Sequence, residues 1–113
     1  MSLEKTEQRI EIRDQQELLG ILGRNDEFLR IMQSGMTCTL VARGNVIVIS
    51  GEEESVALAE QLLSELLFLY RQGLPITAHD VRYSVRMIVE GRQASLHRMF
   101  AETILVTNRG RQV

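Results

Sequence analysis

Four consecutive residues, Gly23-Arg24-Asn25-Asp26, combine a flexible backbone with a cation and have the clearest potential for chemistry in this chain. A glycine-led loop can bring its backbone N–H groups close to an anion such as a phosphate. A carboxylate at the same place repels a polyanion, so Asp26 weakens that potential. The candidate residues for contact with an anion are the following: Gly23, Arg24, Asn25, Asp26, Arg30 and Arg43.

A purely structural interpretation of the same loop stays open. Gly23 serves equally well as a left-handed terminator of the preceding helix. Asp26 or Asn25 serves equally well as the N-cap of the following one. The spacing alone does not separate a phosphate contact from a plain helix connector.

The elements that position this loop follow from the hydrophobic pattern. Helical spacing of apolar residues surrounds the loop, and alternating runs indicate strands on both sides. In chain order the predicted elements are a strand at Glu7–Ile12, helices at Gln15–Leu22 and Glu27–Ser34, strands at Thr37–Arg43 and Val46–Ser50, and a long helix at Glu53–Gln72. The fold class is therefore α+β, in the order β-α-α-β-β-α.

A helix–GxxG–helix link between strands resembles the KH domain, except that Asp26 stands where the second glycine belongs. The resemblance implies a three-stranded antiparallel sheet with helices on one face. It also implies that the candidate residues make weak nucleic-acid contacts, with phosphates at the loop and four nucleotides in the adjoining groove. We expect Phe28, Ile31 and Leu40 to supply the apolar floor of that groove.

The chain is expected to divide into a KH-like domain at residues 7–73 and an extension at residues 74–113. The extension is predicted to contain a helix at Thr77–Glu90, a short helical piece at Ser95–Phe100 and a terminal strand at Thr103–Thr107 that leads into a further domain. The long helix is apolar on more than one face, so we expect the Thr77–Glu90 helix to pack on it.

Composition excludes several functional classes. One cysteine rules out a disulfide framework, and His79, His97 and Cys38 are not at metal-ligand spacing. No apolar run is long enough to cross a membrane, so no membrane partner is expected. The net charge of −2 hides an asymmetry: residues 1–70 hold six Lys/Arg and twelve Asp/Glu, whereas residues 71–113 hold seven Arg and three acids. Those arginines suit phosphate groups, or they simply form solvated helix faces.

Several short motifs narrow the functional prediction. They are Gly23–Arg30 (GRNDEFLR), Asp80-Val81-Arg82-Tyr83, Glu90-Gly91-Arg92 and the run from Thr103 to Arg111. In this order and spacing the chain resembles the N-terminal region of PhoH-like, phosphate starvation-inducible ATPases. The resemblance implies a bacterial, cytoplasmic protein with RNA-related activity, and an attached P-loop ATPase domain that uses ATP and Mg²⁺.

This chain itself contains no GxxxxGK[ST] loop, so we expect no catalytic residues, metal or cofactor within it. Two functions stay open. The first is a module that binds single-stranded RNA or DNA for the attached ATPase. The second is a docking or homo-oligomerisation module built on a degenerate KH fold.

Overall fold

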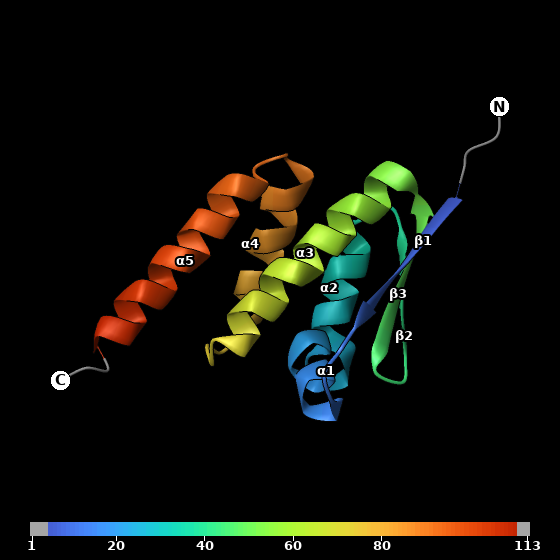
Figure 1. Cartoon of the computed structure of the whole chain (residues 1–113). Coiled ribbons are helices and arrows are strands. Elements are labelled where there is room, and N and C mark those ends of the chain that lie inside the picture. Colours follow the sequence, from blue (N-terminus) through green and yellow to red (C-terminus); the bar gives the residue numbers. More distant parts are fainter. Residues whose placement is uncertain (1–4, 111–113) are drawn as a thin grey trace.

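The computed structural model describes the backbone of residues 5–110 and the side chains of residues 5–104 (Figure 1). Its elements are β1 (Lys5–Glu11), α1 (Gln15–Leu22), the 3-10 turn η1 (Arg24–Asp26), α2 (Glu27–Gly35), β2 (Thr39–Arg43), β3 (Val46–Glu52), α3 (Glu53–Arg71), α4 (Ala78–Val89) and α5 (Gln93–Gly110). The α+β class and the β-α-α-β-β-α order are confirmed. No helix within the described residues has the length and apolarity that a membrane crossing requires.

The three strands form one antiparallel sheet in the order β1-β3-β2. Alternation places Leu40, Ile47 and Ile49 on the buried face, while Val41 on the opposite face is 38% exposed. Helix α3 packs on β1 and β3, and α2 packs on β2. Helices therefore cover one face of the sheet, as the KH-like order predicts.

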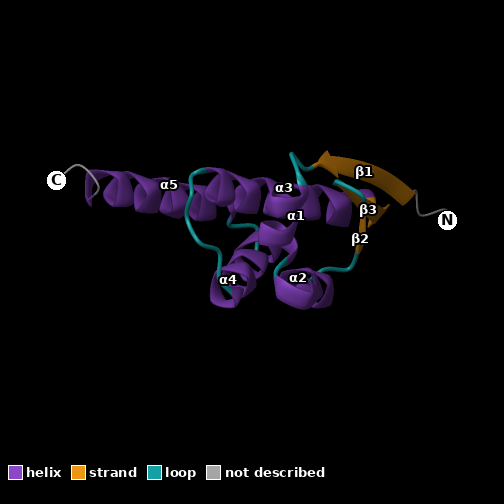
Figure 2. Ribbon diagram, turned by 90° about the horizontal axis from the view of Figure 1, so that it is seen from below, coloured by secondary structure: helices purple, strands orange, loops and turns teal. Residues whose placement is uncertain are grey.

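Helix α4 fills the space beside α2 and α3, and Figure 2 shows α4 and α2 in one layer below α3. Its inward residues Val81 and Ile88 are fully buried. Helix α2 approaches it closely at Gly35, where an added Cβ would lie 2.4 Å from Val85 Cγ1. The expectation that this helix packs on the long helix is confirmed, because α4 supplies the second apolar surface that α3 needs.

The predicted terminal strand at Thr103–Thr107 is wrong, because these residues belong to helix α5. Leu96, Phe100 and Ile104 recur every fourth residue and are all buried, so a helix aligns them on one face toward α3 and α4. Thr103 Oγ1 donates to the Met99 carbonyl at 2.9 Å, which satisfies its hydroxyl within the helix. Tertiary burial of that stripe outweighs the β preference of the branched residues.

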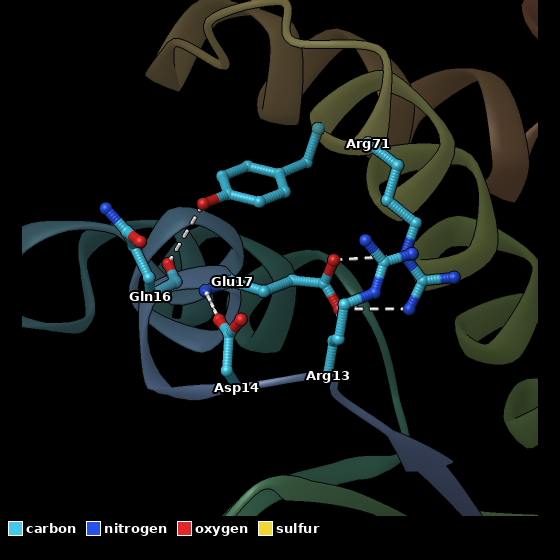
Figure 3. A network of polar contacts seen from close by, with 6 residues as sticks. Arg13, Asp14, Gln16, Glu17 and Arg71 are labelled. Atoms are coloured by element: carbon cyan, nitrogen blue, oxygen red, sulfur yellow. Dashed lines mark hydrogen bonds and ion pairs between the residues drawn. The ribbon is translucent and has the colours of Figure 1, made fainter.

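A buried carboxylate joins the start of α1 to the end of α3 (Figure 3). Glu17 is 2% exposed, and Arg71 donates to both of its oxygens, from Nε at 3.0 Å and from Nη2 at 2.9 Å. The Arg13 backbone N–H donates to Glu17 Oε1 at 2.9 Å. The hydrogen bonds from Arg71 lower the pKa of Glu17 from 4.5 to about 2; burial acts in the opposite direction, and the Arg13 N–H adds to the lowering.

Replacing Arg71 by alanine should destabilise the protein by about 3 kcal/mol at pH 7, because it leaves a buried carboxylate unpaired. The folded pKa of Glu17 is depressed, so the contribution of the pair is complete above pH 4.5 and is lost as pH falls toward 2. The difference in free energy of unfolding between Arg71→Ala and the parent should therefore shrink as pH falls from 4.5 toward 2. Urea unfolding at pH 7, 4 and 2.5 would measure it.

Arg98→Ala is the matched control, because Arg98 is exposed and forms no ion pair within the described residues. Its effect should stay within about 0.5 kcal/mol. The structural role of the pair would be contradicted if Arg71→Ala lost as little stability as Arg98→Ala. A loss of stability that does not change with pH would also contradict it.

Candidate nucleic-acid interface

The loop between α1 and α2 has a positive φ at three of its four residues, and two of them, Asn25 and Asp26, are in the left-handed helical region. Gly23 ends α1 with φ +80°, and its N–H donates to the Leu19 carbonyl at 2.8 Å. Asn25 and Asp26 follow with φ +55° and +59°. A side chain at Gly23 would place Cβ 2.7 Å from Phe28 Cγ, so this position requires glycine both for its conformation and for its packing.

The prediction that Asp26 or Asn25 caps α2 is wrong. At the start of α2 no backbone N–H donates a capping hydrogen bond to the Asp26 side chain, and the Asp26 backbone is left-handed instead of extended. The left-handed conformation turns Asp26 away from the usual N-cap geometry, whose backbone is extended. Gly23 ends α1 with a positive φ, as expected of a terminating glycine, but its ψ of 172° lies outside the left-handed helical region.

Arg30 holds this loop in place. Its Nη1 donates to the Asn25 carbonyl at 2.6 Å, across five residues of sequence. The bond offsets part of the cost of two adjacent non-glycine residues with positive φ. Arg30 thus keeps a positive charge beside the loop and acts mainly as a positioning residue for Asn25.

The loop presents unpaired backbone donors. Within residues 5–104, the N–H groups of Arg24 and Asn25 make no hydrogen bond, whereas the Asp26 N–H donates to the Gly23 carbonyl at 3.2 Å. Arg24, Asn25 and Asp26 are all exposed. Two adjacent free N–H groups beside the Arg24 side chain are the chemistry that binds an anion such as a phosphate oxygen.

A hollow of about 560 Å³, here called the loop hollow, adjoins this backbone. Gly23, Arg24 and Glu27 line its loop side. Its apolar walls are Leu19, Phe28, Tyr70, Leu74, Pro75 and Ile76. Of the floor residues expected from sequence, Phe28 lines this hollow, whereas Ile31 and Leu40 do not.

Arg43 does not join the loop. It ends β2 and lines a separate hollow of the sheet together with Glu7, Arg9 and Val48. No residue of that hollow also lines the loop hollow. Of the six predicted residues, the structure thus groups Gly23, Arg24, Asn25, Asp26 and Arg30, because they are consecutive or bonded to the loop, and separates Arg43.

The other residues singled out from the sequence, a histidine and the C-terminal arginines, lie outside the loop. His97 Nδ1 lies 2.9 Å from Glu65 Oε1, and its ring lies near Phe68, which links α5 to α3. Among the described residues no cluster of His, Cys, Asp or Glu is arranged to hold a metal. Arg82, Arg86, Arg92 and Arg98 are exposed. The side chains of Arg109 and Arg111 lie outside the described residues.

Sequence reasoning did not predict three residues of this site: Tyr70, and Leu74 and Ile76 in the linker between α3 and α4. Tyr70 reads as one more apolar residue of a long helix, and the linker reads as a helix stop around Pro75. The available signal was Gly20, a glycine inside α1. An added Cβ there would lie 2.2 Å from Tyr70 Cε1, so the missing side chain makes room for the ring.

Asp26→Gly should leave the free energy of unfolding unchanged or raise it by up to about 1 kcal/mol, because glycine adopts φ +59° without strain and no capping bond is lost. Thermal and urea unfolding would measure this. Gln61→Gly, at an exposed position inside α3, is the control and should cost about 1 kcal/mol. A loss of similar size from Asp26→Gly would show that the aspartate stabilises the loop.

Comparison with known proteins identifies relatives of this sequence. A PhoH-like protein of Bacillus subtilis is 30% identical over 102 residues, which cover 90% of this chain and 32% of that protein. PhoH-like proteins of Mycobacterium leprae and Mycobacterium tuberculosis H37Rv are 42% and 40% identical over 72 residues, or 64% of this chain. No protein-family model matches the chain, and no solved structure matches it.

The chain spans about a third or less of the length of these relatives. The match to the Bacillus subtilis protein nevertheless covers 90% of this chain, and therefore includes the KH-like elements and the helices that follow. The resemblance predicted from the short motifs is therefore confirmed, and this chain belongs to the PhoH-like family.

Proposed function

We propose that this chain is a module that binds single-stranded nucleic acid, RNA in particular, for a P-loop ATPase domain of a PhoH-like protein. The observation that carries the proposal is the pair of free N–H groups of Arg24 and Asn25 on an exposed loop with a cation beside it. In a KH-like frame this loop is the element that contacts phosphates.

The proposed interaction is weak. Asp26 and Glu27 add two exposed carboxylates next to the donors, and both repel a polyanion. Arg24 and Arg30 supply the opposing charges, but Arg30 also donates to the Asn25 carbonyl. One strand lying across the loop is consistent with this balance, whereas tight binding through an extended basic surface is not.

The remaining parts of the proposal concern the whole protein. The relatives are three to five times longer than the matched region, which leaves room for an ATPase domain that binds ATP and Mg²⁺. We propose a bacterial, cytoplasmic protein with a role in phosphate starvation, in which ATP hydrolysis acts on the nucleic acid that this module holds. Catalytic residues are placed outside this chain, because its sequence lacks the phosphate-binding loop.

Asp26→Gly should strengthen binding of single-stranded RNA several-fold, because it removes a negative charge from the phosphate approach and completes the GxxG pattern. Adding Arg24→Ala should reverse most of that gain. Fluorescence anisotropy of a labelled single-stranded RNA at two salt concentrations would measure both effects, and affinity should fall steeply with salt.

Arg98→Ala in the Asp26→Gly background is the control, because it removes an exposed arginine on α5, away from the loop. If Asp26→Gly binds RNA no better than the parent and Arg24→Ala changes nothing, the loop is only a helix connector. The alternative of a docking or oligomerisation module, which the carboxylate of Asp26 favours, would then replace the proposal.

Titration of this chain with Mg²⁺–ATP should give no binding heat at micromolar concentrations, because no phosphate-binding loop is present. The full-length protein, measured in the same way, should bind. Micromolar affinity of the 113-residue chain would overturn the placement of the nucleotide site outside it.

A further inference from the structure

The loop hollow brings aromatic side chains to the free backbone donors of the loop. The chain contains three Phe, two Tyr and no Trp, so aromatic side chains are scarce. Phe28 and Tyr70 nevertheless both line this one hollow, together with Gly23 and Arg24. The KH-like loop accounts for contacts to phosphates but not for an aromatic hollow built partly by the α3–α4 linker.

We propose that the loop hollow is a pocket for one unpaired nucleobase. The phosphate next to that base lies on the N–H groups of Arg24 and Asn25, and the base stacks on Tyr70. This inference rests on the proposed function, since it needs a single strand at the loop. It deepens that function by assigning a base contact to Tyr70, which neither the sequence motifs nor the KH-like frame indicated.

The structure holds Tyr70 ready for such a contact. Its hydroxyl donates to the Gln16 carbonyl at 3.2 Å, and its ring lies against the backbone of Gly20, where a Cβ would be only 2.2 Å away. The ring is partly exposed. A half-buried, fixed aromatic ring loses little conformational entropy when a base stacks on it.

The walls of the hollow are apolar and partly open to solvent. Leu19 is 63% exposed, the highest value among the exposed large hydrophobic residues of the described chain. Leu74 and Ile76 of the linker also line the hollow and are half-buried. A volume of about 560 Å³ suits a small planar ligand, and a base would cover this apolar surface.

Charge selects the occupant. Arg24 in the lining of the hollow and the two free N–H groups favour an occupant with an anion attached to its planar group, which a nucleotide supplies and an apolar side chain of a protein partner does not. Glu27 in the same lining disfavours a phosphate inside the hollow. The phosphate is therefore placed on the loop and the neutral base in the hollow.

The test compares two single-stranded oligomers of equal length and phosphate number, an oligoadenylate and its abasic counterpart. The parent chain should bind the oligoadenylate at least roughly fivefold more tightly, since stacking on an aromatic ring strengthens binding of a base. Tyr70→Leu should abolish that difference and leave abasic binding unchanged. Tyr70→Phe, which keeps the ring, should preserve it.

Leu19→Ala is a second variant that does not threaten folding, because Leu19 is 63% exposed; it should reduce the preference for the oligoadenylate. Val89→Ala on α4 is its control, since Val89 is also apolar and 51% exposed but does not line the hollow. Circular dichroism of every variant confirms that it is folded.

A spectroscopic readout separates stacking from an indirect effect. Tyr83→Phe leaves Tyr70 as the sole tyrosine, and the chain has no tryptophan. The oligoadenylate should then quench tyrosine fluorescence, and the abasic oligomer should not.

The possible failures are distinguishable. If both oligomers bind equally, with Arg24→Ala weakening both and Tyr70→Leu neither, the base pocket is refuted while phosphate binding stands. If neither the oligoadenylate nor the abasic oligomer binds, both the proposed function and the base pocket are refuted. Self-association that Leu19→Ala disrupts, without any oligomer binding, would assign the hollow to a second copy of the chain.

Discussion

The arrangement of this molecule depends on the ion pair between Glu17 and Arg71. One buried carboxylate receives two hydrogen bonds from the last residue of α3 and one from the backbone ahead of α1 (Figure 3). The Glu17 N–H in turn donates to the Asp14 side chain at 2.9 Å. The pair therefore fixes where β1 turns into α1 and how α1 lies against the end of α3.

That contact also sets the position of Tyr70 in the candidate site. Tyr70 is the neighbour of Arg71 and packs against Gly20 in the helix that ends at the loop. Holding the end of α3 against α1 thus places an aromatic ring beside Gly23 and Arg24. The loop itself carries backbone strain at Asn25 and Asp26, and Arg30 donates a hydrogen bond to the Asn25 carbonyl that offsets part of it.

The helices after the KH-like elements stabilise the core and extend its surface. Helix α3 has buried residues on several sides, including Leu62, Leu63 and Leu66, and the sheet covers only part of them. Helices α1, α4 and α5 cover the rest, with Leu96 and Phe100 buried along α5. The linker that leads into α4 also forms one wall of the loop hollow. The extension is therefore integral to both the core and the proposed site.

Local sequence determined the elements whose signals act over a few residues. Alternation fixed the sheet faces of Leu40 and Ile49, Asp14 caps α1, and Thr77 with Asp80 forms a reciprocal cap on α4. These features were predictable because backbone hydrogen bonds at helix ends and side-chain alternation in strands depend on near neighbours. The loop between the first two helices was found for the same reason.

Only the tertiary structure decided the rest, because those features depend on contacts between residues that are far apart in sequence. Glu17 became a buried partner of Arg71 instead of a solvated helix residue, and Tyr70 became a wall of the loop hollow. Arg43, which the sequence predicted to join the candidate site, lies instead on the open face of the sheet. Thr103 became helical because Phe100 and Ile104 are buried on a shared face. No pattern of neighbouring residues encodes which surface a side chain meets across the fold, and packing of the whole chain made that choice.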